Sequence, residues 1–88
     1  MLKPIITTRF KKDVQLARKR GKDLKKLHLI MQLLLEGKKL PPKCVDHFLS
    51  GNYANRRECH IEPDWLLVYK PGAYEIIFER TGTHSDLF

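Results

Sequence analysis

The stretch "RRECHIEPDWLLVYKPGAYEIIFER", residues 56–80, decides the fold. Its first seven residues alternate in the manner of a strand, so that Cys59 and its odd-numbered neighbours face one side and His60 and its even-numbered neighbours the other. Two turn signals, Pro-Asp-Trp and Pro-Gly-Ala, then separate two further apolar runs, 66–70 and 74–80. Three successive strands joined by tight turns predict an antiparallel meander.

Two helices are expected before this sheet. After a short strand at 3–8, Thr8 is expected to cap a helix over residues 9–20, in which apolar residues recur on one face. Asp23 is expected to cap a second helix over 24–36. The helix ends are marked by Gly21, by Gly37 and by the pair Pro41-Pro42. The expected class is therefore α+β: one domain, 1–88, with two N-terminal helices packed on a twisted antiparallel sheet of about four strands.

Residues 43–55 fit neither period. They predict a packed surface loop, with at most a brief extended piece, anchored by Phe48 and Leu49. His47 lies within this loop.

Composition limits the class of protein. Eighty-eight residues suffice for one modest core, and no apolar run is long enough to cross a membrane or to act as a signal peptide. A cytoplasmic location and no membrane partner are therefore expected. Cys44 and Cys59 form no metal or disulfide motif, so both are interpreted as buried free thiols.

The charge is unevenly distributed. Residues 1–43 carry 13 lysines and arginines against 3 acidic residues, whereas residues 44–88 carry 4 against 7. Such a basic half is typical of a protein that contacts nucleic acid or the ribosome. The alternative is that these cations only keep the helices solvated.

Three histidines and a carboxylate in the second half could perform acid–base chemistry: His47, His60, Asp64 and His84. Metal-free RNA cleavage suits them, because it needs a base for the 2′-hydroxyl, an acid for the leaving 5′-oxygen and cations for the phosphorane. The candidate cations are Arg56, Arg57 and Arg80, and the aromatic rings that could stack on bases are Trp65 and Phe88.

Other interpretations remain open for these residues. A metal site with His60, Asp64 and His84 as ligands is one, but no metal-binding motif accompanies them. Taken singly, His60 could be merely solvated, Trp65 could pack in the core, and Phe88 could tie down the terminus. A cysteine nucleophile is disfavoured, since Cys59 faces away from His60.

The segments "DHFLSG", "CHIEPDWLLVY" and "ERTGTHSDLF", after a basic helical hairpin, resemble the YafQ branch of the RelE/ParE toxin superfamily. The resemblance runs through essentially the whole chain. It implies the compact fold of small microbial ribonucleases and a toxin of a type II toxin–antitoxin pair. Such toxins cleave messenger RNA in the ribosomal A site without a metal ion or other cofactor, and a cognate antitoxin blocks them. Operator DNA is contacted only through the complex with that antitoxin.

The resemblance places the functional residues at His47, His60, Asp64, Trp65, Arg80, His84 and Phe88. His84 is the expected general acid, and His60 or Asp64 the general base. His47 is expected to contact the scissile phosphate or to fix a partner's tautomer, and Arg80 to stabilise phosphorane charge. The cations expected to contact ribosomal RNA are Lys11, Lys12, Arg18 and Lys19.

Two other functions are alternatives. One is a non-catalytic module that binds RNA or the ribosome, in which the histidines would be incidental. The other is a toxin of the ParE type that acts on DNA gyrase, which needs no catalytic histidines.

Overall fold

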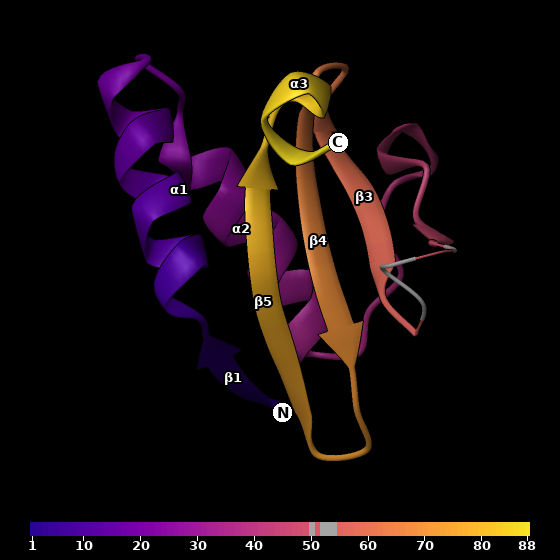
Figure 1. The fold of residues 1–88 in the computed structure, drawn as a ribbon. Coiled ribbons are helices and arrows are strands. Elements are labelled where there is room, and N and C mark those ends of the chain that lie inside the picture. Colours follow the sequence, from indigo (N-terminus) through magenta and orange to yellow (C-terminus); the bar gives the residue numbers. More distant parts are fainter. Residues whose placement is uncertain (50, 52–54) are drawn as a thin grey trace.

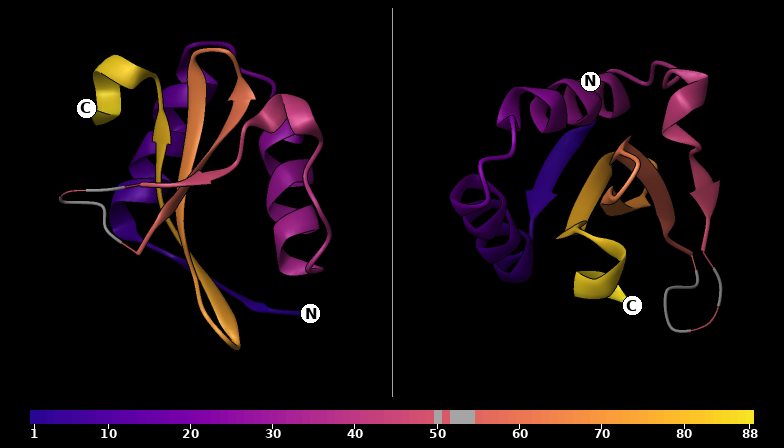
Figure 2. Two further views of the ribbon diagram at one scale, coloured as in Figure 1. Left: turned by 90° about the vertical axis from the view of Figure 1, so that its right-hand side faces the viewer. Right: turned by 90° about the horizontal axis from the view of Figure 1, so that it is seen from above.

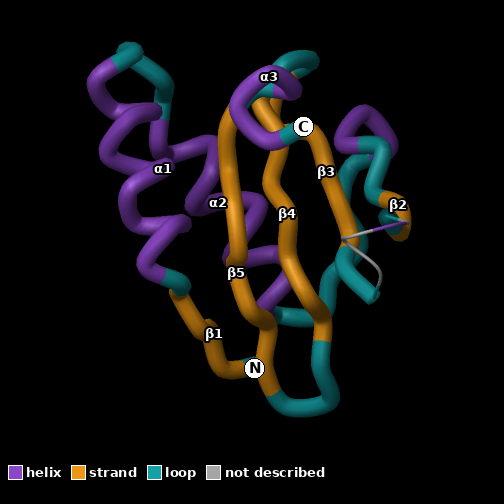
Figure 3. Tube along the Cα trace, in the orientation of Figure 1, coloured by secondary structure: helices purple, strands orange, loops and turns teal. Residues whose placement is uncertain are grey.

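The computed structural model describes residues 1–49, 51 and 55–88, which form one five-stranded sheet and three α-helices (Figure 1). The strand order is β1-β5-β4-β3-β2, which can be followed along the tube in Figure 3. The predicted meander is confirmed as β3 (Arg57–Glu62), β4 (Trp65–Pro71) and β5 (Glu75–Gly82), each antiparallel to the next. The α+β class is also confirmed.

The sheet is mixed and has five strands, where an antiparallel sheet of about four was expected. The first strand, β1 (Lys3–Ile6), pairs in parallel with β5, from Lys3 opposite Glu75 to Ile6 opposite Phe78. Parallel neighbours cannot be joined by a tight turn, so the chain between them must cross over one face of the sheet. The two long helices lie in this crossover (Figure 1).

Both long helices begin at side-chain caps. Helix α1 (Thr8–Lys19) is capped by Thr7, not by Thr8 as expected, because the Thr7 hydroxyl accepts from the main-chain N–H of Phe10 and donates to the Glu79 carbonyl. Helix α2 (Leu24–Leu35) is capped by Asp23, as expected. Thr7 therefore joins the start of α1 to strand β5.

The sheet separates two apolar clusters of unequal size. Helices α1 and α2 cover one face, where the main core includes Phe10, Leu27, Cys59 and Phe78. On the opposite face lies the short helix α3 (His84–Leu87), as the two views of Figure 2 show. There a smaller cluster of Leu66, Val68 and Leu87, with Leu49 packed against it, lies on a face that neither long helix covers, called the open face below. This second face is the one on which a site can form.

The segment predicted as a loop contains a 3₁₀ turn η1 (Pro42–Cys44) and a two-residue strand β2 (His47–Phe48) paired with β3. Leu49 anchors it as expected. Phe48 does not, because its side chain is exposed beneath the Arg57 guanidinium, whose carbon lies 4.3 Å from the ring centre. Residues 50 and 52–54 of the predicted loop lie outside the described residues.

Cys44 and Cys59 are buried free thiols, as expected. Burial raises the pKa of the Cys59 thiol far above its ordinary value, which opposes any role as a thiolate nucleophile. None of the helices formed by the described residues has the length and apolar run that a bilayer crossing requires.

Candidate active site

A buried carboxylate joins two of the predicted histidines on the open face of the sheet. Glu58 Oε1 lies 3.3 Å from His60 Nε2 and 3.7 Å from His47 Nε2. The Glu58 side chain is only 8% exposed, while that of His47 is 48% exposed. Glu58 and His60 share a face because they are two positions apart on β3, and β2 brings His47 directly opposite Glu58.

Glu58 is absent from the residues that the sequence singles out as a site. The alternation in β3 does place it on the His60 face, and that was the available signal. An isolated glutamate on a polar strand face is usually solvated, however, and only the pairing of β2 with β3 shows that this one is buried between two imidazoles.

His84 and Asp64 form a second pair. His84 is the first residue of α3, and Asp64 lies in the turn between β3 and β4. The ring Nδ1 of His84 is 2.7 Å from Asp64 Oδ1. The same oxygen accepts the main-chain N–H of His84 at 3.0 Å. This N–H, followed by the ring, holds the pKa of the Asp64 carboxyl below its usual range. Because an ionised carboxylate can only accept, the His84 proton lies on Nδ1 and Nε2 is directed elsewhere.

The two pairs meet near the C-terminal end of β3. The ring centres of His60 and His84 are 5.8 Å apart, with the rings nearly perpendicular at 76°. His47, His60, Asp64 and His84, four of the five residues expected to be catalytic, are thus brought together. Each of the two central imidazoles has its own carboxylate partner.

The fifth, Arg80, is held by an aspartate of helix α1. Its Nε lies 2.7 Å from Asp13 Oδ2 and its terminal nitrogen donates to Asp13 Oδ1 at 3.2 Å; both side chains are 13% exposed. Asp13 Oδ2 also accepts the main-chain N–H of Thr81 at 3.1 Å. Strand β1 pairs with β5 only as far as Phe78, so Asp13 occupies the edge that β1 leaves uncovered. Arg80 is opposite Val68 in β4, which places it on the open face.

Two of the residues expected to bind RNA have other contacts. The Arg57 side chain lies on the helix-covered face, where its Nε donates to Asp46 at 3.0 Å, and Asp46 also accepts from the Tyr69 hydroxyl at 2.8 Å. The Trp65 ring is 1% exposed in the main core, and its Nε1 donates to the Thr81 hydroxyl at 2.9 Å. The Trp65 ring is therefore not available to a base in this arrangement, while the partly exposed Arg57 side chain is engaged by Asp46. Core packing, the alternative for Trp65, is confirmed.

Phe88 and Arg56 lie differently. Phe88, at the end of α3, is 60% exposed, which favours an accessible ring over one that tucks in to tie down the terminus. Arg56 forms an ion pair with Glu79 across the open face. The cations expected to contact ribosomal RNA are all exposed on α1: Lys11, Lys12, Arg18 and Lys19.

One group of side chains has the spacing of a metal site. Ligand atoms of His47, Glu58 and His60 all lie within 4.8 Å of one another. This set differs from the one considered from the sequence, which used Asp64 and His84 with His60. Any divalent ion held there would occupy the ring nitrogens of two of the clustered histidines.

Comparisons with known proteins agree on one family. A family model described as the bacterial toxin of type II toxin–antitoxin system, YafQ, matches residues 2–88. The mRNA interferase toxin YafQ of Escherichia coli K12 is 48% identical over 80 residues, which cover 90% of this chain and 87% of the relative.

Two solved structures are similar over their whole length. The crystal structure of the E. coli DinJ–YafQ complex superposes with a TM-score of 0.93 at 43% identity, covering 100% of this chain and 99% of the other. The crystal structure of a metal-bound toxin from Helicobacter pylori gives a TM-score of 0.94 at 39% identity, with both chains covered in full.

Proposed function

Because this chain belongs to the YafQ family of type II toxins and is an mRNA interferase, we propose that it cleaves messenger RNA on the ribosome by metal-independent acid–base catalysis. The base removes the proton of a ribose 2′-hydroxyl, and the resulting oxyanion forms a bond to the adjacent phosphorus. The bond from phosphorus to the 5′-oxygen breaks, and the acid protonates that oxygen. The products are a 2′,3′-cyclic phosphate and a 5′-hydroxyl end.

The observation that carries this proposal is the meeting of two imidazoles with separate carboxylate partners, 5.8 Å apart at their ring centres. Two proton-transfer groups on either side of one phosphodiester are what the reaction needs. His84 acts as the acid: Asp64 accepts from its Nδ1 and stabilises the imidazolium, so the proton that leaves is the one on Nε2.

His60 acts as the base. Of the two candidates for this role, Asp64 has its Oδ1 engaged by His84 and a lowered pKa, both of which weaken it as a proton acceptor. Glu58, whose Oε1 lies 3.3 Å from His60 Nε2, stabilises the cation that forms when Nδ1 takes the proton. His47 Nδ1 lies 3.1 Å from the Phe48 carbonyl and Nε2 lies 3.7 Å from Glu58 Oε1, so that a protonated His47 supplies positive charge beside the phosphate. Arg80 stabilises the phosphorane, and the exposed ring of Phe88 stacks on a base.

The substrate is mRNA held by the ribosome. The exposed cations of α1 contact ribosomal RNA, and their effect should weaken as salt is raised. A cognate antitoxin inhibits the toxin; the E. coli relative is described in complex with DinJ. Through that complex the pair reaches its operator DNA.

The decisive experiment maps the 5′ ends of mRNA on programmed ribosomes with the wild type, His60→Ala and His84→Ala. Cleavage should fall by about 100-fold or more in both variants, while His28→Ala, which removes an exposed histidine of α2 outside the site, should cleave normally. Full cleavage by both folded site variants would disprove the acid–base scheme. Growth arrest without new 5′ ends would instead indicate a non-catalytic ribosome-binding module, or a gyrase toxin if DNA supercoiling changes.

Metal-independence is tested in the same assay. The H. pylori relative is described as metal-bound, and the His47–Glu58–His60 group offers an ion the same nitrogens that the proposed reaction uses. Cleavage should survive EDTA and should be inhibited by added Zn²⁺. Loss of cleavage in EDTA with recovery on adding Zn²⁺ would overturn this part of the proposal.

A further inference from the structure

Helix α3 carries the proposed acid but has little intrinsic stability. It is a single turn, His84–Leu87, and isolated turns of this length do not persist in water. Its first turn is closed by a capping box, in which the Thr83 hydroxyl accepts the Asp86 N–H at 3.1 Å and Asp86 Oδ2 accepts the Thr83 N–H at 2.9 Å. Asp86 therefore fixes the backbone on both sides of His84.

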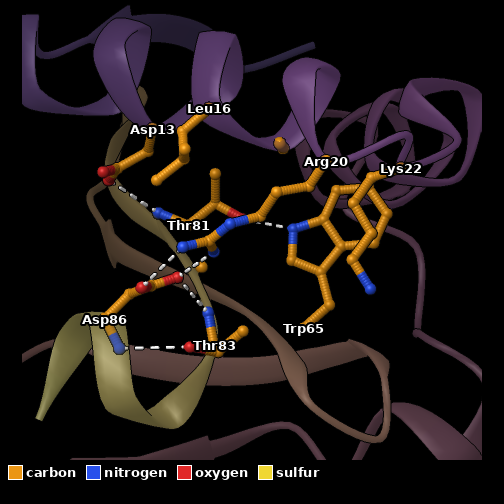
Figure 4. A pocket seen from close by; sticks show the side chains of 10 residues that line it. Asp13, Leu16, Arg20, Lys22, Trp65, Thr81, Thr83 and Asp86 are labelled. Carbon is orange, nitrogen blue, oxygen red and sulfur yellow. Dashed lines mark hydrogen bonds and ion pairs between the residues drawn. The ribbon is translucent and has the colours of Figure 1, made fainter.

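Asp86 is in turn held by a residue far away in the sequence. Arg20, at the C-terminal end of α1, donates from one terminal nitrogen to Asp86 Oδ2 at 2.6 Å and from the other to Oδ1 at 3.2 Å (Figure 4). This forked contact fixes the carboxylate in direction as well as in position. Arg20 first, and the Thr83 N–H second, hold the pKa of the Asp86 carboxyl far below its usual range.

The close approach also depends on a glycine. A Cβ at position 82 would lie 2.9 Å from Asp86 Oδ2 and 3.0 Å from Asp86 Cβ, closer than non-bonded atoms tolerate. Gly82 leaves the room in which the Asp86 carboxylate reaches both Thr83 and Arg20.

We propose that Arg20 and Asp86 form a clamp between α1 and α3 that positions His84 for proton transfer, so that both are positioning residues. The clamp holds the helix that carries His84, while Asp64 holds its ring. This inference rests on the proposed role of His84 as the acid. Loss of the clamp should leave the ribosome bound and the sheet intact, and should lower the rate of the chemical step.

The test uses single-turnover cleavage on ribosomes at saturating toxin, with ribosome affinity and melting temperature measured separately. Arg20→Ala and Asp86→Ala should each lower the cleavage rate by about 10- to 100-fold, as expected for a displaced catalytic group. The two substitutions change the net charge in opposite directions, so an effect of charge on ribosome binding cannot explain a shared loss. Arg20→Lys keeps the charge but not the fork, and should recover only part of the rate.

Two controls separate positioning from general damage. Lys38→Ala breaks an exposed ion pair with Glu36 at the end of α2 and should leave the rate unchanged. In a His84→Ala background, Arg20→Ala should cause no further loss, because its effect passes through His84.

Normal rates in both clamp variants, with His84→Ala inactive, would overturn the clamp and leave the proposed function standing. A further loss in the His84→Ala background would also overturn it. If His84→Ala itself cleaves normally, the proposed function fails and the clamp with it.

Discussion

Replacing Asp13 by alanine should lower the free energy of unfolding by about 3 to 4 kcal/mol. The Arg80 guanidinium and the Asp13 carboxylate are each only 13% exposed. Removing one partner of a buried pair costs about 3 to 5 kcal/mol, because the other charge stays desolvated. The slight exposure places Asp13 at the lower end of that range, and the lost acceptor for the Thr81 N–H adds to the cost. For a domain of this size, the melting temperature should fall by about 12 °C or more.

Urea unfolding measures this directly. The chain has one tryptophan, Trp65, which is buried against Thr81 and so reports on the same end of β5. Asp13→Asn keeps an oxygen that can accept either from the Arg80 guanidinium or from the Thr81 N–H, so it should lower the free energy of unfolding about half as much as Asp13→Ala. A double-mutant cycle with Arg80→Ala isolates the coupling between the two charges.

Glu36→Gln is the matched control, since it breaks an exposed ion pair with Lys38. It should leave the unfolding curve unchanged. If Asp13→Ala lowered stability no more than this control, the reasoning from burial would be refuted, and Asp13 would not be what holds Arg80.

Four other predictions concern α3 and the surface. Gly82→Ala should displace Asp86, lower cleavage by about 10-fold or more and increase hydrogen exchange at the Phe88 N–H, which donates to the His84 carbonyl; unchanged exchange would contradict this. The lowered Asp86 pKa stabilises the folded state fully above the unfolded pKa of about 4, and this contribution shrinks as the pH falls from there toward the much lower folded pKa. The difference in unfolding free energy between wild type and Asp86→Asn should therefore be largest near neutral pH and decrease steadily below about pH 4. Deleting Phe88 should lower the cleavage rate clearly while the melting temperature changes little. A large fall in the melting temperature as well would indicate a packing role instead. Charge reversal on the outer face of α1 should weaken ribosome binding most at low salt, and an affinity independent of salt would exclude this contact; the positions are Lys11, Lys12, Arg18 and Lys19.

Local patterns were enough to predict the helices and the meander. Asp23 as a cap and the alternation around Cys59 and His60 depend on neighbouring residues alone, and the structure confirms them. The parallel pairing of β1 could not be predicted in this way, because it depends on which sheet edge remains open after the meander forms. The choice of Thr7 over Thr8 as the cap has the same origin, since the Thr7 hydroxyl also donates to Glu79 in β5.

The grouping of the candidate residues was easier to predict than their contacts. The resemblance placed His60, Asp64 and His84 correctly near one another, but it did not show which carboxylate serves which imidazole. The sequence did not single out Glu58, and it left Trp65 open between stacking on bases and packing in the core. The reason is the same for both residues: burial depends on what packs over a strand, and neither β2 nor the Thr81 contact can be read from the residues nearby in the sequence.

The pairing of β1 with β5 has a consequence for the chain while it is being made. Lys3 pairs with Glu75, so the first strand has no partner until most of the protein has been synthesised. His84 is added only after β5 is complete. Closure of so long a loop is slow compared with the formation of local contacts. A growing chain therefore lacks both a closed sheet and the proposed acid, so on the proposed mechanism it cannot cleave before translation has passed residue 84.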